Sequence, residues 1–118
     1  MATLDVLTYG FALSTDQGSF GYSTNSLLRA GNKNILVDTG PSSRRPFLVK
    51  SLKAKGLEPA DIDIVVLTHM HWDHCQNTDL FTNARVLVNP TEIDYARSPN
   101  KWDLAVAAGM ADMMRNMN

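Results

Sequence analysis

Three histidines and one aspartate stand close together in the stretch THMHWDHCQN. They are His69, His71, Asp73 and His74, and they include every histidine of the chain. Three imidazoles and a carboxylate packed this tightly are costly to bury unless a cation pairs with them. Imidazole and carboxylate without a cluster of thiolates suit zinc, iron or manganese in a hydrolytic site better than a structural zinc, which normally brings cysteines. The pattern therefore predicts a metal site.

The spacing separates these four groups into two pairs. In an extended segment, side chains two residues apart point the same way, so His69 and His71 can face one point. Once the chain turns at Trp72, Asp73 and His74 can face a second point nearby. Two metal ions about 3.5 to 4 Å apart can share a hydroxide and hold both the attacking and the leaving oxygen of a hydrolysis. The sequence therefore predicts two divalent ions.

The elements before the motif place it at one end of a buried sheet. The run from Ile62 to Leu67 is too continuous to alternate, which is typical of a strand buried on both faces. The motif follows directly, at the carboxyl end where α/β proteins carry their sites. Asp38 ends an earlier apolar strand in the same way. We expect its carboxylate to accept a hydrogen bond from a ligand imidazole or its loop, with a turn or cap before Pro41 as the alternative.

The remaining elements follow from hydrophobic spacing and from turn and cap residues. In chain order we expect a strand over 3–9, a loop to 24, a hairpin over 27–37, a helix from 42 or 43 to 56 with a serine cap, strands over 62–67 and 85–88, and helices from 89 and from 98. The second-last helix has Asn89 as its cap and Glu92 reaching back. Strand, helix, strand over 35–67 is the βαβ arrangement, which indicates an α/β chain.

The last expected helix carries an apolar stripe at helical spacing. Its members are Val106, Met110, Met113, Met114 and Met117. Such a stripe is typical of a core face. Because it stands at the end of the sequence, we expect another subunit or a further segment to cover it.

Composition excludes several classes of protein. A chain of 118 residues with 44% apolar residues suffices for one compact domain. Its net charge of -1 offers no basic field for nucleic acid, and we expect the adjacent pair Arg44 and Arg45 to be a solvated helix start. The run from Ile64 to Leu67 is too short to span a bilayer. The start lacks the blocks of a secretory signal, so we expect a cytoplasmic protein without a nucleic-acid or membrane partner.

Two neighbours of the predicted ligands have simpler interpretations. Cys75 is the single cysteine, and we expect a small buried hydrophobe rather than a soft metal ligand. Without a second cysteine there is no internal disulfide, which fits a reducing compartment. Trp72 is expected to pack or to line a pocket.

Residues from about 22 to about 96 resemble the metallo-β-lactamase-fold hydrolases. The resemblance rests on STNSLLRAGNKNILVDTGP, IDIVVLTHMHWDHCQN and DLFTNARVLVNPTEIDYA, and it is strongest toward the lactonase-like and glyoxalase II-like members. It implies an α/β (α+β) fold, with residues 1–118 forming a single unit: the N-terminal half of a four-layered αββα sandwich built from two similar halves.

The resemblance also implies a role for each motif residue. His69 and His71 would bind the first metal ion, Asp73 and His74 the second, and Asp38 would support the site from behind. A metal-bridging hydroxide would attack a carbonyl or phosphorus, and Asp73, as the catalytic residue, would steer a proton. The implied cofactors are two divalent ions, with zinc first and iron or manganese as alternatives.

Hydrolysis of an ester, lactone or thioester bond in a small-molecule substrate is the function that this resemblance implies. A phosphodiesterase is a second interpretation, which the near-neutral charge disfavours. A half-fold that binds metal or assembles without catalysing a reaction is a third.

The motif alone leaves each ion short of ligands. It offers two to each, whereas a catalytic zinc usually keeps three protein ligands and a water. In the family, the second half supplies two further histidines and a bridging aspartate, and this sequence has no histidine after His74. Asp79, Glu92 and Asp94 are carboxylates that could contribute. We therefore expect a homodimer or pairing with a C-terminal half, and a fragment, a natural half-fold or a weakly binding remnant all stay open.

Overall fold

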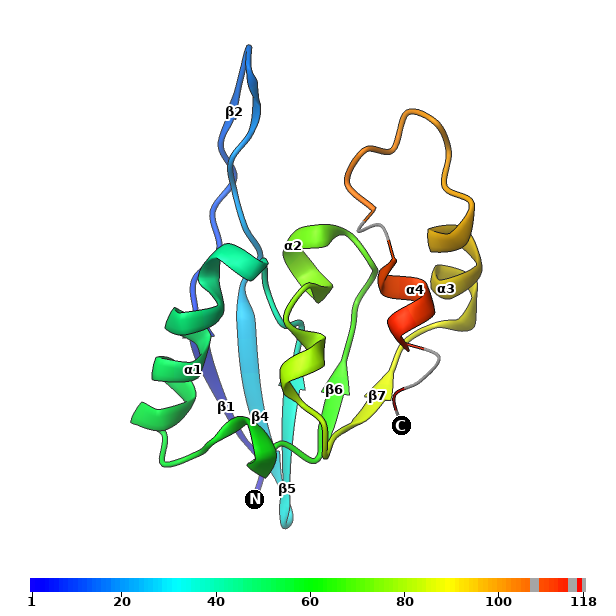
Figure 1. Ribbon diagram of the computed structural model, residues 1–118. Helices are drawn as coiled ribbons and strands as arrows, with labels where there is room; N and C mark the ends of the chain where they lie inside the picture. Colours follow the sequence, from blue (N-terminus) through cyan, green and yellow to red (C-terminus); the bar gives the residue numbers. More distant parts are fainter. Residues whose placement is uncertain (107–108, 115–116, 118) are drawn as a thin grey trace.

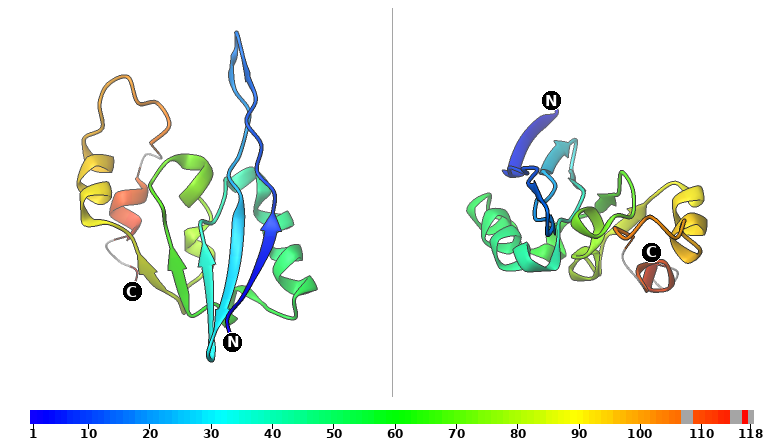
Figure 2. Two further views of the ribbon diagram at one scale, coloured as in Figure 1. Left: turned by 180° about the vertical axis from the view of Figure 1, so that it is seen from behind. Right: turned by 90° about the horizontal axis from the view of Figure 1, so that it is seen from above.

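One mixed sheet organises the chain, with α1, α2 and α4 on one of its faces and α3 beside β7 (Figures 1 and 2). The structure is a computed structural model that describes residues 1–106, 109–114 and 117. The strands in spatial order are β1 (Thr3–Thr8), β4 (Asn25–Ala30), β5 (Lys33–Val37), β6 (Ile64–Val66) and β7 (Arg85–Leu87). The helices are α1 (Arg45–Ala54), α2 (Trp72–Cys75), α3 (Pro90–Arg97) and α4 (Met110–Met114).

The sheet changes from antiparallel to parallel at β5. The pairs β1–β4 and β4–β5 are antiparallel, and β5–β6 and β6–β7 are parallel. Gly31, with φ of 60°, makes the tight turn between β4 and β5. Helix α1 then crosses from β5 to β6, as a parallel connection requires. The α/β class and the βαβ unit expected from the sequence are confirmed.

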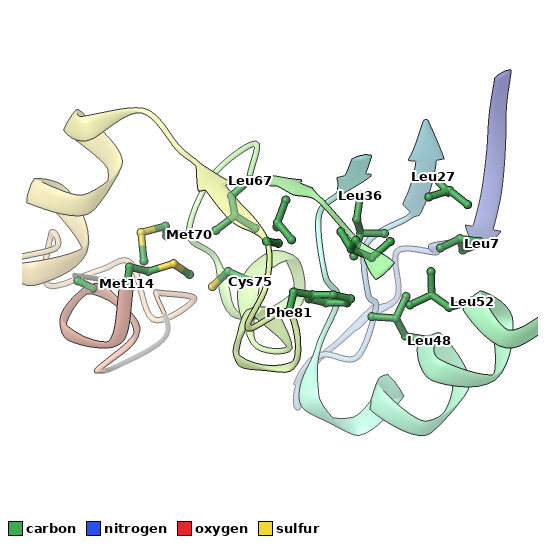
Figure 3. Close-up of a cluster of buried hydrophobic side chains, with 14 residues drawn as sticks. Leu7, Leu27, Leu36, Leu48, Leu52, Leu67, Met70, Cys75, Phe81 and Met114 are labelled. Carbon is green, nitrogen blue, oxygen red and sulfur yellow. The ribbon is translucent and has the colours of Figure 1, made fainter. Parts of the chain in front are cut away.

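The core lies between the sheet and these helices (Figure 3). One leucine from β4, one from β5 and a valine from β6 point toward the helices, and helical and loop side chains cover them. These residues are Leu27, Leu36, Val65, Leu48, Leu52 and Phe81, and each is at most 1% exposed. Burial of this apolar surface provides the main driving force for folding.

The opposite face of the sheet, hereafter the outer face, is also apolar. Strand alternation turns every second residue away from the helices, and the register aligns Leu4 with Leu28, Leu28 with Ile35, and Ile35 with Ile64. A second row joins Val37 to Val66, and Val66 to Leu87. All of these side chains are partly or largely exposed. Within this chain, β6 therefore fully buries only its helix side, and Ile64 and Val66 do not reach the burial on both faces that we expected for 62–67.

The segment expected as a loop before residue 24 forms a hairpin. Its strands are β2 (Ser14–Thr15) and β3 (Gly18–Ser19), and below them the rings of Phe11 and Tyr22 pack edge to face at 4.7 Å. Added Cβ atoms at Gly10 and Gly21 would collide with the opposite backbone. The two arms can therefore cross only because both positions are glycine.

The start of α1 differs from the expected serine cap. Ser42–Arg44 form a 3-10 turn, and no side chain caps either this turn or α1 by a hydrogen bond. Pro46 in the first turn lacks the amide that a cap would satisfy. The predicted end is confirmed, because Gly56 has a φ of 75°.

The helix predicted from Ser98 is wrong over 98–106, where the chain makes turns instead. The side-chain oxygens of Asn100 and Asp103 each accept a hydrogen bond from the backbone amide two residues later, at 3.0 and 3.1 Å. Such local turns compete with helix formation. The longest helix, α1, has ten residues, and none within 1–106 and 109–114 has the length and apolarity of a membrane span.

The methionine stripe packs within the chain. In α4, Met114 is 7% exposed and Ala111 is 4% exposed, and Figure 3 shows Met114 beside Met70 and Cys75. The core interpretation of the stripe is confirmed for α4. The expectation that another subunit or segment must cover it is wrong for Met114, and Val106 lies outside the helix.

Replacing Phe81 by alanine tests this description of the core. The ring is fully buried, so Phe81→Ala should lower the free energy of unfolding by about 3–5 kcal/mol. Leu104 is 90% exposed, and Leu104→Ala should change it by less than about 0.5 kcal/mol. Urea denaturation followed by circular dichroism measures both, and equal effects would contradict the packing.

Candidate metal centre

Neighbouring parallel strands bring Asp38 and the histidine motif to the same end of the sheet. Val37 of β5 pairs with Val66 of β6, and the Asp38 amide donates to the Val66 carbonyl at 2.9 Å. The motif continues directly from β6, and His71 precedes the short helix α2. The carboxyl ends of both strands therefore open onto one site.

The carboxylate of Asp38 contacts the motif at Thr68 and at His74. Its side chain is almost fully buried, and it accepts hydrogen bonds from the Thr68 amide and hydroxyl, each at 2.8 Å. It also lies 2.8 Å from Nδ1 of His74. A φ of 57° is required at this residue, a conformation that Asp and Asn tolerate better than other side chains that carry a Cβ. The structure thus places Asp38 behind a predicted ligand.

A buried amide fixes α2 against the turn that follows β5. Asn77 is fully buried and donates from Nδ2 to the carbonyls of Thr39 and Pro41, at 2.9 and 2.8 Å. The Thr39 amide donates to the carbonyl of His74 at 2.7 Å. These bonds fix the backbone on both sides of Asp38. Our sequence reasoning did not single out Asn77.

The three imidazole rings face one another. The ring centroids of His69 and His71 are 4.7 Å apart, and those of His69 and His74 are 4.0 Å apart. The carboxylate of Asp73 lies 3.5 Å from Nε2 of His74. The structure therefore brings all four predicted ligands together.

One nitrogen of each ring has a close protein partner. Nδ1 of His69 contacts the Thr68 hydroxyl at 3.0 Å, Nε2 of His71 contacts Asp103 at 3.2 Å, and Nδ1 of His74 contacts Asp38. Ligand histidines usually hold one nitrogen in this way, which fixes the ring and leaves the other nitrogen for an ion.

Burial and charge act differently on two of the rings. Desolvation lowers the pKa of His69, and the neighbouring charges of His74 and His71 lower it further. The neutral form, which binds metal, is thereby favoured. For His74, desolvation opposes the charged form, but the hydrogen bond to Asp38 and the charges of Asp38 and Asp73 outweigh it and raise the pKa.

Neutral imidazole nitrogens and a carboxylate are chemically suited to a divalent ion such as zinc. Within residues 1–106 and 109–114, however, no three His, Cys, Asp or Glu side chains form a group that could hold an ion. The donors fit in kind and are incomplete in number, so the four motif residues account for part of a metal centre.

The other candidate donors lie apart from this centre or have other partners. Asp79 pairs with Arg45 at 2.6 Å, and Asp94 pairs with Arg97. Cys75 is fully buried, and desolvation raises its pKa to about 12, so it remains a thiol within the core, as expected.

Of the three further carboxylates considered from the sequence, Glu92 contacts the motif. It does not reach back to its helix cap as expected: its Oε2 accepts a hydrogen bond from the Met70 amide at 3.3 Å. Asn89 still caps α3, because its side chain accepts from the Thr91 amide. Glu92 therefore supports the backbone between His69 and His71.

Asp103 also contacts the motif, and the helix that periodicity predicts over its segment gives no sign of this contact. Its carboxylate contacts both His71 and the hydroxyl of Tyr95, at 3.2 and 3.0 Å. The run SPNKWD, rich in turn-forming residues, is the signal that could have indicated a loop here. A contact between residues 71 and 103 was not predictable from their spacing.

A cavity of about 230 Å³ adjoins the cluster, between the β2–β3 hairpin and α2. Phe11, Leu13, Tyr22 and Trp72 are among the residues that line it, and Asp73 is its one charged side chain. A second hollow of about 430 Å³ lies against the 98–106 loop, and Trp72 belongs to its lining as well. Trp72 therefore lines both hollows, as a pocket-wall residue would.

Residues 18–112 match the family model of the Metallo-beta-lactamase superfamily. Metallo-beta-lactamase domain-containing protein 1 of Mus musculus is 39% identical over 71% of this chain and 34% of its own length. An N-acyl homoserine lactonase of Agrobacterium fabrum is 40% identical over 44% of this chain and 20% of its own length. The chain spans about a third of the length of the first curated relatives it matches.

Two solved structures are similar to this chain in fold. A candidate metallo-beta-lactamase of Thermotoga maritima superposes with a TM-score of 0.68 and 30% identity, over 76% of this chain and 44% of that one. AidC, a dizinc quorum-quenching lactonase, gives 0.57 and 30% identity, over 70% and 32% of the two chains.

Replacing Asp38 by asparagine tests its place beneath the motif. Asparagine tolerates the same backbone conformation but offers one acceptor oxygen instead of two, so Asp38→Asn should lower the free energy of unfolding by about 1–3 kcal/mol. Asp79→Asn is the control, because that carboxylate pairs with Arg45 at the surface, and it should cost less than about 1 kcal/mol. Both are measured by urea denaturation without metal, and an unchanged Asp38→Asn would contradict the geometry.

Proposed function

This chain belongs to the metallo-beta-lactamase superfamily, and on that premise we propose that it provides the metal-binding half of a hydrolase for lactones or related esters. One observation carries the proposal: three imidazoles each have one nitrogen held by a protein partner, and a carboxylate stands beside them. Side chains that serve only in packing would not require one nitrogen of each ring to be held next to a carboxylate.

The motif residues would divide between two divalent ions, with zinc as the first choice. His69 and His71 would hold one ion, and Asp73 and His74 the other. When bound, such ions polarise a carbonyl and lower the pKa of water toward neutrality. Asp38 keeps His74 in place, and the carboxylate of Asp73 is positioned to take up or release a proton. The single cysteine is free and buried, so we place the protein in the reducing cytoplasm.

The lining of the cavity favours a neutral substrate with an apolar substituent. Phe11, Leu13 and Trp72 offer apolar surface next to Asp73, and neither hollow beside Trp72 is lined by lysine or arginine. A phosphodiester would need cationic partners for its charge, whereas a lactone or ester with an acyl chain would not. The likeness to an N-acyl homoserine lactonase and to AidC supports the same choice.

We also infer that a second half-domain packs on the outer face and brings the remaining ligands. Seven aliphatic side chains there are aligned across the strands and lack full cover, and an apolar sheet face of this kind normally packs against another layer. This half could be part of the same polypeptide or of another chain. The larger size of the relatives supports the proposal.

Zinc binding and hydrolysis test the proposed activity. Protein that contains both halves should bind close to two zinc ions, and it should hydrolyse N-hexanoyl homoserine lactone but not bis(p-nitrophenyl) phosphate. A chelator should abolish the activity, and Asp73→Asn should lower kcat by at least about 10²-fold. Asp79→Asn, whose carboxylate pairs with Arg45, serves as the control and should retain it. Activity unchanged in His71→Ala would contradict the proposal, and cleavage of the phosphodiester alone would reverse the choice of substrate.

Light scattering of the 118-residue chain tests the outer face. Alone, it should associate with increasing concentration and bind a hydrophobic dye, because its aligned aliphatic residues remain in water. Ile35→Lys should reduce both effects, whereas Leu104→Lys, at an already exposed site away from that face, should not. A stable monomer that binds no dye would show that the face needs no partner.

A further inference from the structure

We propose that Asp103 is a positioning residue for His71, and that it makes Nδ1 the nitrogen with which this ring binds an ion. The inference rests on the proposed function, because it takes His71 to be a metal ligand. Asp103 lies outside the histidine motif of residues 69–74 and reaches the cluster from the 98–106 loop.

The contact itself determines which nitrogen is available. Nε2 of His71 lies 3.2 Å from Oδ2 of Asp103. A carboxylate only accepts hydrogen bonds, so Nε2 carries the proton and donates it. A neutral imidazole has one ring proton, which leaves the lone pair on Nδ1. Carboxylate partners of ligand histidines fix the tautomer and the ring orientation in this way.

Asp103 is itself held in place by two further donors. The Tyr95 hydroxyl donates to Oδ2 at 3.0 Å, and the Ala105 amide donates to Oδ1 at 3.1 Å. Both oxygens of the carboxylate are therefore engaged, which limits its freedom to turn away from His71.

The backbone of the loop is joined to the motif at the same place. The Trp72 amide donates to the Ala105 carbonyl at 2.7 Å, and His71 forms an isolated antiparallel bridge with Val106. The loop thus docks beside the ligand that Asp103 contacts, and its conformation and the orientation of His71 depend on each other.

A purely structural role for Asp103 makes different predictions. If it only fastened the loop, its removal would lower the stability of the metal-free protein without changing the His71 tautomer or the affinity for zinc. Asp94 provides a matched control, because it is a carboxylate of the adjacent helix α3 that pairs with Arg97 and has no contact with the cluster.

The test compares wild type, Asp103→Asn, Asp103→Glu, Tyr95→Phe and Asp94→Asn as 118-residue chains. Zinc affinity is measured by competition with a chromophoric chelator, and the His71 tautomer by long-range ¹H–¹⁵N spectra without metal. We expect the Nε2–H tautomer in wild type and a mixture in Asp103→Asn. Asp103→Asn should weaken zinc binding by about 10- to 100-fold, Tyr95→Phe by about 3- to 10-fold, and Asp103→Glu should recover part of the loss.

The outcomes separate this inference from the proposed function. Zinc binding by wild type with equal affinity in Asp103→Asn and Tyr95→Phe would overturn the role of Asp103 and leave the metal centre intact. Absence of zinc binding by wild type, with or without a second half, would overturn both. Should Asp103→Asn fail to fold, Tyr95→Phe alone decides, because it removes one hydroxyl from a half-exposed ring and keeps the carboxylate.

Discussion

The buried carboxylate of Asp38 is the interaction on which the rest of the site depends. It links the end of β5 to the loop after β6 and reaches His74 with its second oxygen. A buried carboxylate is tolerated at this depth because its partners donate hydrogen bonds to it. The carboxylate therefore fixes the backbone of the motif before any ligand is present, and the left-handed backbone at Asp38 restricts which residues could replace it.

The three imidazoles of the cluster are held from two sides. From the sheet, Asp38 and Thr68 hold the imidazoles of His74 and His69, while Asp103 holds that of His71 from a distant loop. Each contact leaves one nitrogen of the ring for another purpose, so the protein has restricted the rotation of the rings in advance. In the metal centre that we propose, such preorganisation would lower the entropic cost of binding an ion.

The sequence allowed the βαβ core and the grouping of the four motif residues to be predicted, because both follow from short-range patterns. The turn at Gly31 and the end of α1 at Gly56 were equally local. The 98–106 loop was not predicted, since the side chains of Asn100 and Asp103 favour turns where periodicity favoured a helix. The contact of Asp103 with His71 depends on how the chain returns to the sheet, which no spacing rule records.

Two glycines below the β2–β3 hairpin limit which substitutions this part of the chain can accept. Neither Gly10 nor Gly21 can accept a side chain, so the pivot of the hairpin is fixed. Between these positions, Leu13 and Phe20 are about half exposed and do not belong to the buried core. Substitutions on this arm can reshape the rim of the cavity at little cost in stability, so the shape of the cavity can vary while the proposed metal centre is left unchanged.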